Sequence, residues 1–212
     1  MTGVPSGWET PLWPDLVNTS VGSQIYEFLD LLTYASRRCF FMKKLTTLDL
    51  VYMAFYAALF MVLDYFTNMI PFLKMPNGGS IGVSTIALIV CSYHLGWIKG
   101  TIVGLVSVLI QFVTGPMYIP QLLGFLMDYL IAFSVYGLAS LFPNYKYFYS
   151  GILITNFLRF ASHTIGGVIV WETTWWGSII YNAPYMIATT IVGMIVVPIL
   201  VERLHLNKEK TA

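Results

Sequence analysis

The segment RFASHTIGGVIVWETTWW, residues 159–176, gathers polar and aromatic side chains inside an otherwise apolar part of the chain. Arg159 and His163 are four residues apart, so a helix places them on one face. Gly167 and Trp171 continue that face by two further turns. A lone histidine in a membrane helix often makes only a helix–helix hydrogen bond. A cation, an imidazole, a gap and an indole in one stripe instead favour a ligand-binding face.

Two aspartates lie in apolar runs. Asp128, in GFLMDYLIAF, has apolar neighbours on both sides, and a carboxylate facing lipid at that depth would be costly. We therefore expect Asp128 to face the protein interior, either paired with Arg159 or as the counter-charge of a ligand that is cationic or donates hydrogen bonds. Asp64 lies near the end of its run, where water or headgroups can solvate it, and is the weaker candidate.

The sequence contains no Ser–His–Asp pattern, no His/Cys/Glu cluster with metal spacing, no P-loop and no glycine-rich dinucleotide fingerprint. Cys39 and Cys91 are expected to be unpaired thiols. The net charge of +1 and the lack of a basic patch give no sign of nucleic acid as a partner. We expect a binder or carrier that is not an enzyme, uses no cofactor or metal and does not hydrolyse ATP itself.

Composition predicts an all-α integral membrane protein, because 57% of the residues are hydrophobic and only 10% are charged, against about 25% charged in soluble domains. Several apolar runs approach the roughly 20 residues that cross a bilayer as a helix. The predicted spans are residues 48–66, 81–95, 97–114, 121–142, 148–171 and 179–201. Only HLGW joins the second span to the third, so five spans is the alternative count.

Loop charge predicts the orientation. Basic residues precede the first span (Arg37, Arg38, Lys43, Lys44), follow the last (Arg203, Lys208, Lys210) and lie in two loops on that same side (Lys99, Lys146). The opposite side carries Lys74 alone. By the positive-inside rule both termini are cytoplasmic, which requires an even number of spans and favours six.

Residues 1–41 differ from the rest of the chain. They are rich in Pro, Gly, Ser and Thr, so we expect a poorly ordered extension, with a short interfacial helix as one possibility around residues 25–32. Met42 could be the natural start of the protein. Residues 42–212 are expected to form the membrane domain.

Four motifs resemble those of a known family. MAFYAALFMVL places Ala54 and Ala58 four residues apart, and YIPQLLGFLMDY has a tyrosine followed ten residues later by an acid and a tyrosine. RFASHTIGGVIVW has a basic residue, a histidine four later and a GxxxW ending, and SIIYNAPYM contains a YN pair. From about Met42 onward the chain resembles the S components of energy-coupling factor vitamin transporters, most closely the thiamin-specific S component.

The resemblance implies a six-helix subunit of the bacterial plasma membrane that binds thiamin or a thiamin precursor in an outward-facing pocket. It implies that the subunit works with a transmembrane coupling protein and two ATPase subunits, and that Ala54 and Ala58 dock on the coupling protein. A thiazolium cation stacks well on aromatic rings, and an aminopyrimidine suits a carboxylate and an amide. The ligand-binding residues that the resemblance implies are Tyr118, Asp128, Tyr129, Arg159, His163, Trp171 and Asn182.

The chain departs from the family pattern in three places. The family usually has glutamate at the position of Asp128, and a lid tryptophan where this chain reads KMPNGGSIGV. A pocket tyrosine of the family falls near Gly177, with Trp176 one position away. Two alternatives therefore stay open: an S component for another vitamin, or a separate carrier in which Asp128 and His163 relay protons. Glu172 and Trp175, like Trp176, either close the site or anchor the helix among headgroups.

Overall fold

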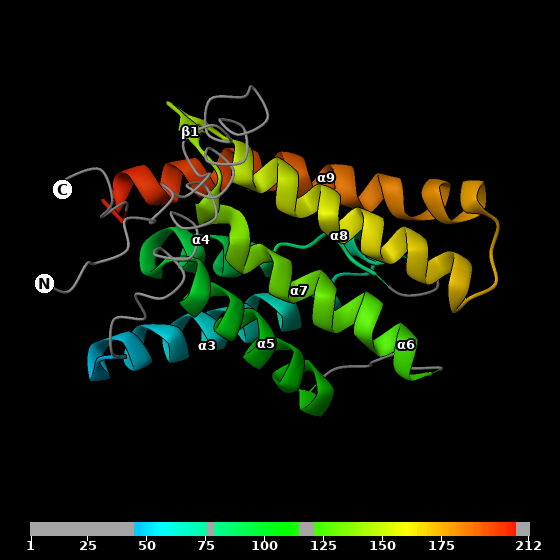
Figure 1. Cartoon of the computed structure of the whole chain (residues 1–212), viewed down its shortest axis with the longest axis horizontal. Coiled ribbons are helices and arrows are strands. Elements are labelled where there is room, and N and C mark those ends of the chain that lie inside the picture. The colour runs from blue at the N-terminus through cyan, green and yellow to red at the C-terminus, as the bar shows by residue number, and fades with distance from the viewer. Residues whose placement is uncertain (1–44, 76–78, 115–120, 207–212) are drawn as a thin grey trace, which may run out of the picture. The chain divides into compact units, whose positions relative to one another are not determined.

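The structure, a computed structural model, describes residues 45–75, 79–114 and 121–206. Helices dominate this part of the chain (Figure 1). They are α3 (Thr47–Met69), η1 (Pro71–Leu73), α4 (Thr85–Leu95), α5 (Trp97–Thr114), α6 (Leu122–Phe125), η2 (Leu126–Ile131), α7 (Ala132–Ser134), η3 (Val135–Leu141), α8 (Ser150–Ile169) and α9 (Trp175–Arg203). A two-stranded hairpin, β1 (Asn144–Tyr145) and β2 (Phe148–Tyr149), precedes α8. The expected N-terminal extension, Met42 and Tyr118 lie outside the described residues.

Four helical segments are long and apolar enough to cross a membrane: Thr47–Met69, Leu122–Leu141, Ser150–Ile169 and Trp175–Arg203. α4 and α5 are shorter apolar helices. Gly96, with a φ of 89°, ends α4, and α5 begins at the next residue and packs against α4. The second and third apolar runs are therefore separate helices. The expected mostly helical membrane protein is confirmed at this level.

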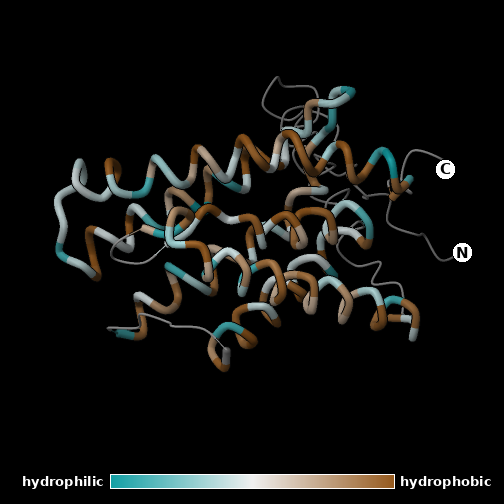
Figure 2. Tube along the Cα trace, turned by 180° about the vertical axis from the view of Figure 1, so that it is seen from behind, coloured by the Kyte–Doolittle hydropathy of each residue, from teal (hydrophilic) through white to brown (hydrophobic). Residues whose placement is uncertain are grey.

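Apolar residues occupy both the protein interior and the outer surface of the packed helices. Figure 2 shows hydrophobic stretches along every helix, with hydrophilic residues mainly near helix ends and in loops. Phe60, Leu88 and Tyr136 are fully buried, whereas many large apolar side chains such as Phe55 and Leu109 are exposed on the outer surface. Soluble monomers rarely expose so much contiguous apolar surface, and a bilayer would cover it.

Local interactions fix the start of α3. Thr46 and Asp49 form a reciprocal capping box at its first turn. Asp49 also pairs with Lys99 of α5 at 2.6 Å, which ties the first turns of these two helices together. Gly137 allows η3 to approach α5 so closely that a Cβ there would overlap Thr101.

Several helix boundaries differ from the sequence-based expectation: α3 runs on to Met69, and α4 begins at Thr85, four residues after the predicted start of the second span. Two other shifts have a local cause. α8 ends at Ile169, because Val170 and Thr173 turn back to the carbonyls of Gly166 and Gly167, so Trp171 lies beyond the helix. α9 begins at Trp175, four residues before the predicted start, because the Thr174 hydroxyl accepts from the Gly177 amide and caps the helix.

The hairpin between η3 and α8 is fastened to the end of α9. The Tyr149 hydroxyl donates to Glu202 at 3.1 Å. Burial, together with the Glu202 carboxylate, raises the pKa of Tyr149 to about 12, so this hydroxyl keeps its proton over the physiological range.

Candidate ligand-binding site

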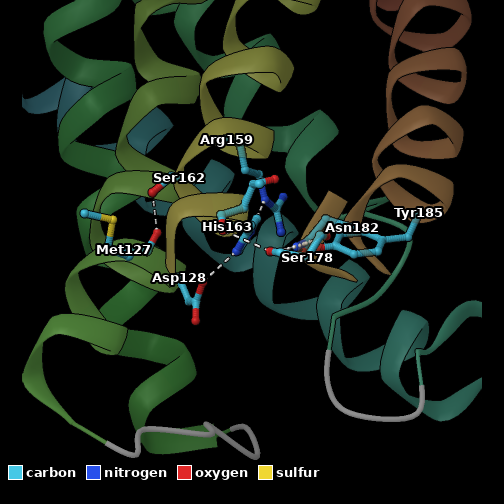
Figure 3. A network of polar contacts seen from close by, with 9 residues as sticks. Met127, Asp128, Arg159, Ser162, His163, Ser178, Asn182 and Tyr185 are labelled. Atoms are coloured by element: carbon cyan, nitrogen blue, oxygen red, sulfur yellow. Dashed lines mark hydrogen bonds and ion pairs between the residues drawn. The ribbon is translucent and has the colours of Figure 1, made fainter. Parts of the chain in front are cut away.

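His163 lies at the centre of a buried polar network (Figure 3). The Nε of Arg159 donates to His163 Nε2 at 3.0 Å, and His163 Nδ1 lies 2.9 Å from Asp128 Oδ1. A guanidinium can only donate, so Nε2 accepts and the ring proton is on Nδ1, from which it is donated to Asp128. The network thus selects one neutral tautomer of His163 and orients its ring.

Arg159 is a cation held inside the protein, 6% exposed. Its Nη1 donates to the Tyr136 hydroxyl at 3.1 Å. The same hydroxyl donates to Asn156 Oδ1 at 2.9 Å. The guanidinium carbon lies 4.6 Å from the centre of the Phe133 ring, within cation–π range. The predicted proximity of Arg159 and His163 is present. Within the described residues Asp128 pairs with His163. One expectation was a direct pair between Asp128 and Arg159, and the imidazole lies between these two side chains instead.

Asp64 is the second carboxylate near this cation. Its Oδ1 accepts from Ser84 Oγ at 3.1 Å and its Oδ2 from Asn68 Nδ2 at 3.0 Å. Asp64 and Arg159 also interact electrostatically. The sequence ranked Asp64 below Asp128 because of its position near the end of an apolar run, and that position alone did not reveal its hydrogen bond from Ser84.

A cavity of about 580 Å³ opens beside Asp64, between α3 and α5. Its lining is mainly apolar and aromatic, with Asp64, Asn68 and Gln111 as polar members. Its aromatic members are Phe60, Tyr65 and Phe66.

The local backbone around Asp128 is not a regular α-helix. Residues 126–131 form the π-helical segment η2 between α6 and α7, so both Asp128 and Tyr129 project from a widened turn. Tyr129 stacks on Phe125 with ring centres 6.2 Å apart. The sequence predicted one continuous helix here. Residues 122–141 are helical throughout, but they form consecutive α, π, α and 3₁₀ segments.

Asn182 is also in the interior, 7% exposed, and belongs to a group on α9. Its amide nitrogen donates to the Ser178 carbonyl at 2.9 Å, and its Oδ1 accepts from the Tyr185 hydroxyl at 2.5 Å. The Tyr185 ring meets His163 edge to face, with ring centres 6.3 Å apart. Tyr185 therefore connects Asn182 to the imidazole, and sequence reasoning missed it. Its spacing of three residues from Asn182 in YNAPY was the available signal.

The segment before α4 packs on the same part of α9. Gly79, with a φ of 88°, brings its backbone against the Tyr185 ring, where a Cβ would lie 3.4 Å from the ring carbons. The amide of Gly82 donates to Thr189 Oγ1 at 2.8 Å. This is the stretch in which the chain departs from the family pattern by lacking a lid tryptophan, and here the backbone of Gly79 and Gly82 meets α9.

The structure thus brings together Asp128, Arg159 and His163, and joins Asn182 to them through Tyr185. Trp171 is 44% exposed just past the end of α8, and Trp175 and Trp176 are more exposed at the start of α9. A carboxylate, an oriented imidazole and an amide, with aromatic rings nearby, can recognise a ring with hydrogen-bond donors. No group of three or more His, Cys, Asp or Glu that could hold a metal occurs among the described residues.

Comparison with known proteins shows the family of the chain. The model of the thiamine transporter protein family (Thia_YuaJ) matches residues 50–208. The thiamine transporter ThiT of Bacillus subtilis is 28% identical over 172 residues, which cover 71% of this chain and 88% of that protein. A solved structure of ThiT from Listeria monocytogenes has the same fold, with a TM-score of 0.65, 23% identity and coverage of 75% of this chain and 96% of that one. The chain is therefore a multi-pass bacterial membrane protein that belongs to the thiamine transporter protein family.

Proposed function

We propose that this chain is a substrate-binding S component that binds thiamin and delivers it to an ATP-driven energy-coupling factor importer. The observation that carries the proposal is the Asp128 carboxylate, held inside a membrane protein of the thiamine transporter family by the oriented ring of His163. The resemblance to S components and the relation to ThiT of Bacillus subtilis support the same ligand.

Thiamin offers groups that match this chemistry. Its aminopyrimidine donates hydrogen bonds that Asp128 can accept, and the amide of Asn182 can serve the same ring after Tyr185 releases it. Its thiazolium cation stacks on aromatic faces, a role we assign to Tyr118, Tyr129 and Trp171. Arg159 contributes by holding His163 in place.

We further propose six membrane spans in residues 42–212, with both termini in the cytoplasm and the pocket facing outward. The start of α3 and the end of α9 lie at the same end of the helices in Figure 1, which supports an even number of spans. The basic residues that flank the first and last spans support a cytoplasmic location for that end.

The proposed partners are a transmembrane coupling protein and two ATPase subunits. Ala54 and Ala58 lie on the exposed face of α3, opposite its buried residues Tyr56 and Phe60. Small residues four apart let another helix approach closely in a membrane. This exposed pair supports α3 as the surface that docks on the coupling protein.

A ligand panel tests the proposal directly. Purified protein in detergent is heated with thiamin, with its separate pyrimidine and thiazole precursors, or with an unrelated vitamin such as riboflavin or biotin. We expect thiamin to raise the unfolding temperature, because a ligand that binds only the folded state stabilises it by mass action. Stabilisation by riboflavin or biotin with none by thiamin or its precursors would reject the ligand. Uptake in cells that stops with a protonophore but survives loss of the ATPases would reject the ATP-driven mechanism.

A further inference from the structure

The carboxylate of Asp128 is aimed by an irregular turn. In the π-helical segment η2, residues 126–131, backbone hydrogen bonds run between residues five apart. A π turn shifts the direction of the side chains that it carries relative to a regular α-helix, and such turns are frequent at functional sites. The position of the Asp128 carboxylate therefore depends on what keeps this turn in its widened form.

Ser162 of α8 supplies one such contact. Its hydroxyl donates to the backbone carbonyl of Met127 at 2.6 Å, across the interface between α8 and η2 (Figure 3). Ser162 is 6% exposed, so water offers this carbonyl little competition. The bond attaches the residue immediately before Asp128 to the helix that carries His163.

Gly166, one turn further along α8, leaves the space that the carboxylate occupies. A Cβ on Gly166 would lie 3.0 Å from Asp128 Oδ1 and 3.3 Å from Met127 Cβ. Oδ1 is also the atom that accepts from His163 Nδ1. A methyl group at residue 166 would thus crowd this oxygen and require the carboxylate to shift by a few tenths of an ångström relative to His163.

We propose that Ser162 and Gly166 are positioning residues for thiamin recognition: Ser162 holds the π turn and Gly166 leaves room for the carboxylate that the turn presents. Neither side chain needs to touch the ligand, because both act through Asp128. The inference rests on the proposed function, in which Asp128 accepts hydrogen bonds from thiamin.

The test compares variants with matched controls, each scored for thiamin affinity by tryptophan fluorescence and for unfolding temperature without ligand. Ser162→Ala should weaken thiamin binding about three- to tenfold, the equivalent of one net hydrogen bond. Ser162→Thr, which keeps the hydroxyl, should recover most of that loss. The control is Ser107→Ala, since Ser107 is buried in α5 and also donates to a backbone carbonyl, at 2.8 Å. It should lose similar stability and keep its affinity.

Gly166→Ala should weaken binding by about tenfold, an order-of-magnitude expectation for a shifted charge-assisted hydrogen bond. Its control is Gly193→Ala in α9, where an added Cβ would meet only the Ile152 side chain, at 3.2 Å. In an Asp128→Asn background, the effects of Ser162→Ala and Gly166→Ala on affinity should shrink, because residues that act through one group are not additive.

Three outcomes decide the matter. Wild-type affinity in both Ser162→Ala and Gly166→Ala would overturn the inference and leave the proposed function intact. Undiminished losses in the Asp128→Asn background would also overturn it, because the two residues would then act by another route. Absence of thiamin binding by the wild-type protein would instead reject the proposed function, and the inference would fall with it.

Discussion

Replacing His163 by alanine is the most direct test of the buried network. The imidazole accepts from Arg159 at 3.0 Å and donates to Asp128 at 2.9 Å, so one substitution removes both hydrogen bonds. The methyl group of alanine can replace neither. Asp128 loses the donor that orients it, and Arg159 loses the acceptor of its Nε.

The size of the effect follows from these two bonds. A hydrogen bond to a charged group contributes about 1.5–3 kcal/mol, and a buried polar group left without its partner costs about 1–3 kcal/mol. Part of this loss lowers the stability of the ligand-free protein, and rearranged water recovers some of the rest. We therefore expect thiamin binding to weaken by about 1–3 kcal/mol, or roughly five- to 150-fold.

Titration of tryptophan fluorescence with thiamin, on purified protein in detergent, measures this change. Trp171, Trp175 and Trp176 lie at one end of α8 and α9 and should report the ligand. His205→Ala is the matched control, because His205 is exposed beyond the end of α9 and should leave affinity unchanged. Affinity of His163→Ala within twofold of wild type would refute the proposed role of the network in binding.

Five further substitutions separate the remaining roles. Asp128→Asn should weaken thiamin binding about tenfold or more, because an amide is a poorer acceptor than a carboxylate, and should matter less for a thiamin analogue whose pyrimidine amino group is replaced by oxygen. Trp171→Ala should lower affinity, whereas Trp176→Ala, at the more exposed start of α9, should not; equal losses in both titrations would contradict this. Ala54→Trp should stop uptake in cells yet preserve binding in detergent, and intact uptake would exclude this docking face. Asp64→Asn should weaken binding of thiamin more than binding of an uncharged isostere, and equal losses would remove its electrostatic role.

Much of the fold could be predicted because helix length and apolar composition are local properties of the chain. The boundaries that moved depend on contacts at helix ends: Thr174 caps α9 early, and the turn at Val170 stops α8 before Trp171. The hairpin of β1 and β2 was missed because two-residue strands leave almost no periodic signal. Its link from Tyr149 to Glu202 joins residues that are far apart in the sequence.

The contacts of the candidate site likewise divide into those that local spacing predicts and those that depend on how the helices pack. Arg159 and His163 could be paired from their spacing, since a regular helix makes residues four apart neighbours. The link from His163 to Asp128 could not, because it depends on how α8 packs against η2 and on the π turn that presents the carboxylate. Ser162 acts through a contact to a backbone carbonyl, and an ordinary serine in an apolar run gives no signal of such a contact. The spacing of Tyr185 from Asn182 indicated a shared helix face, but it did not show that the Tyr185 ring meets His163.

The charges of the interior give a physical reason for a cationic ligand. Arg159 reaches Asp128 only through the neutral ring of His163, which accepts from the guanidinium and donates to the carboxylate. Among the described residues, Asp128 is hydrogen-bonded to this neutral ring and pairs directly with no guanidinium or ammonium group. An excess charge inside a membrane protein is costly unless a counter-charge accompanies it. A ligand with a single positive charge, such as thiamin, would supply a counter-charge for the Asp128 carboxylate.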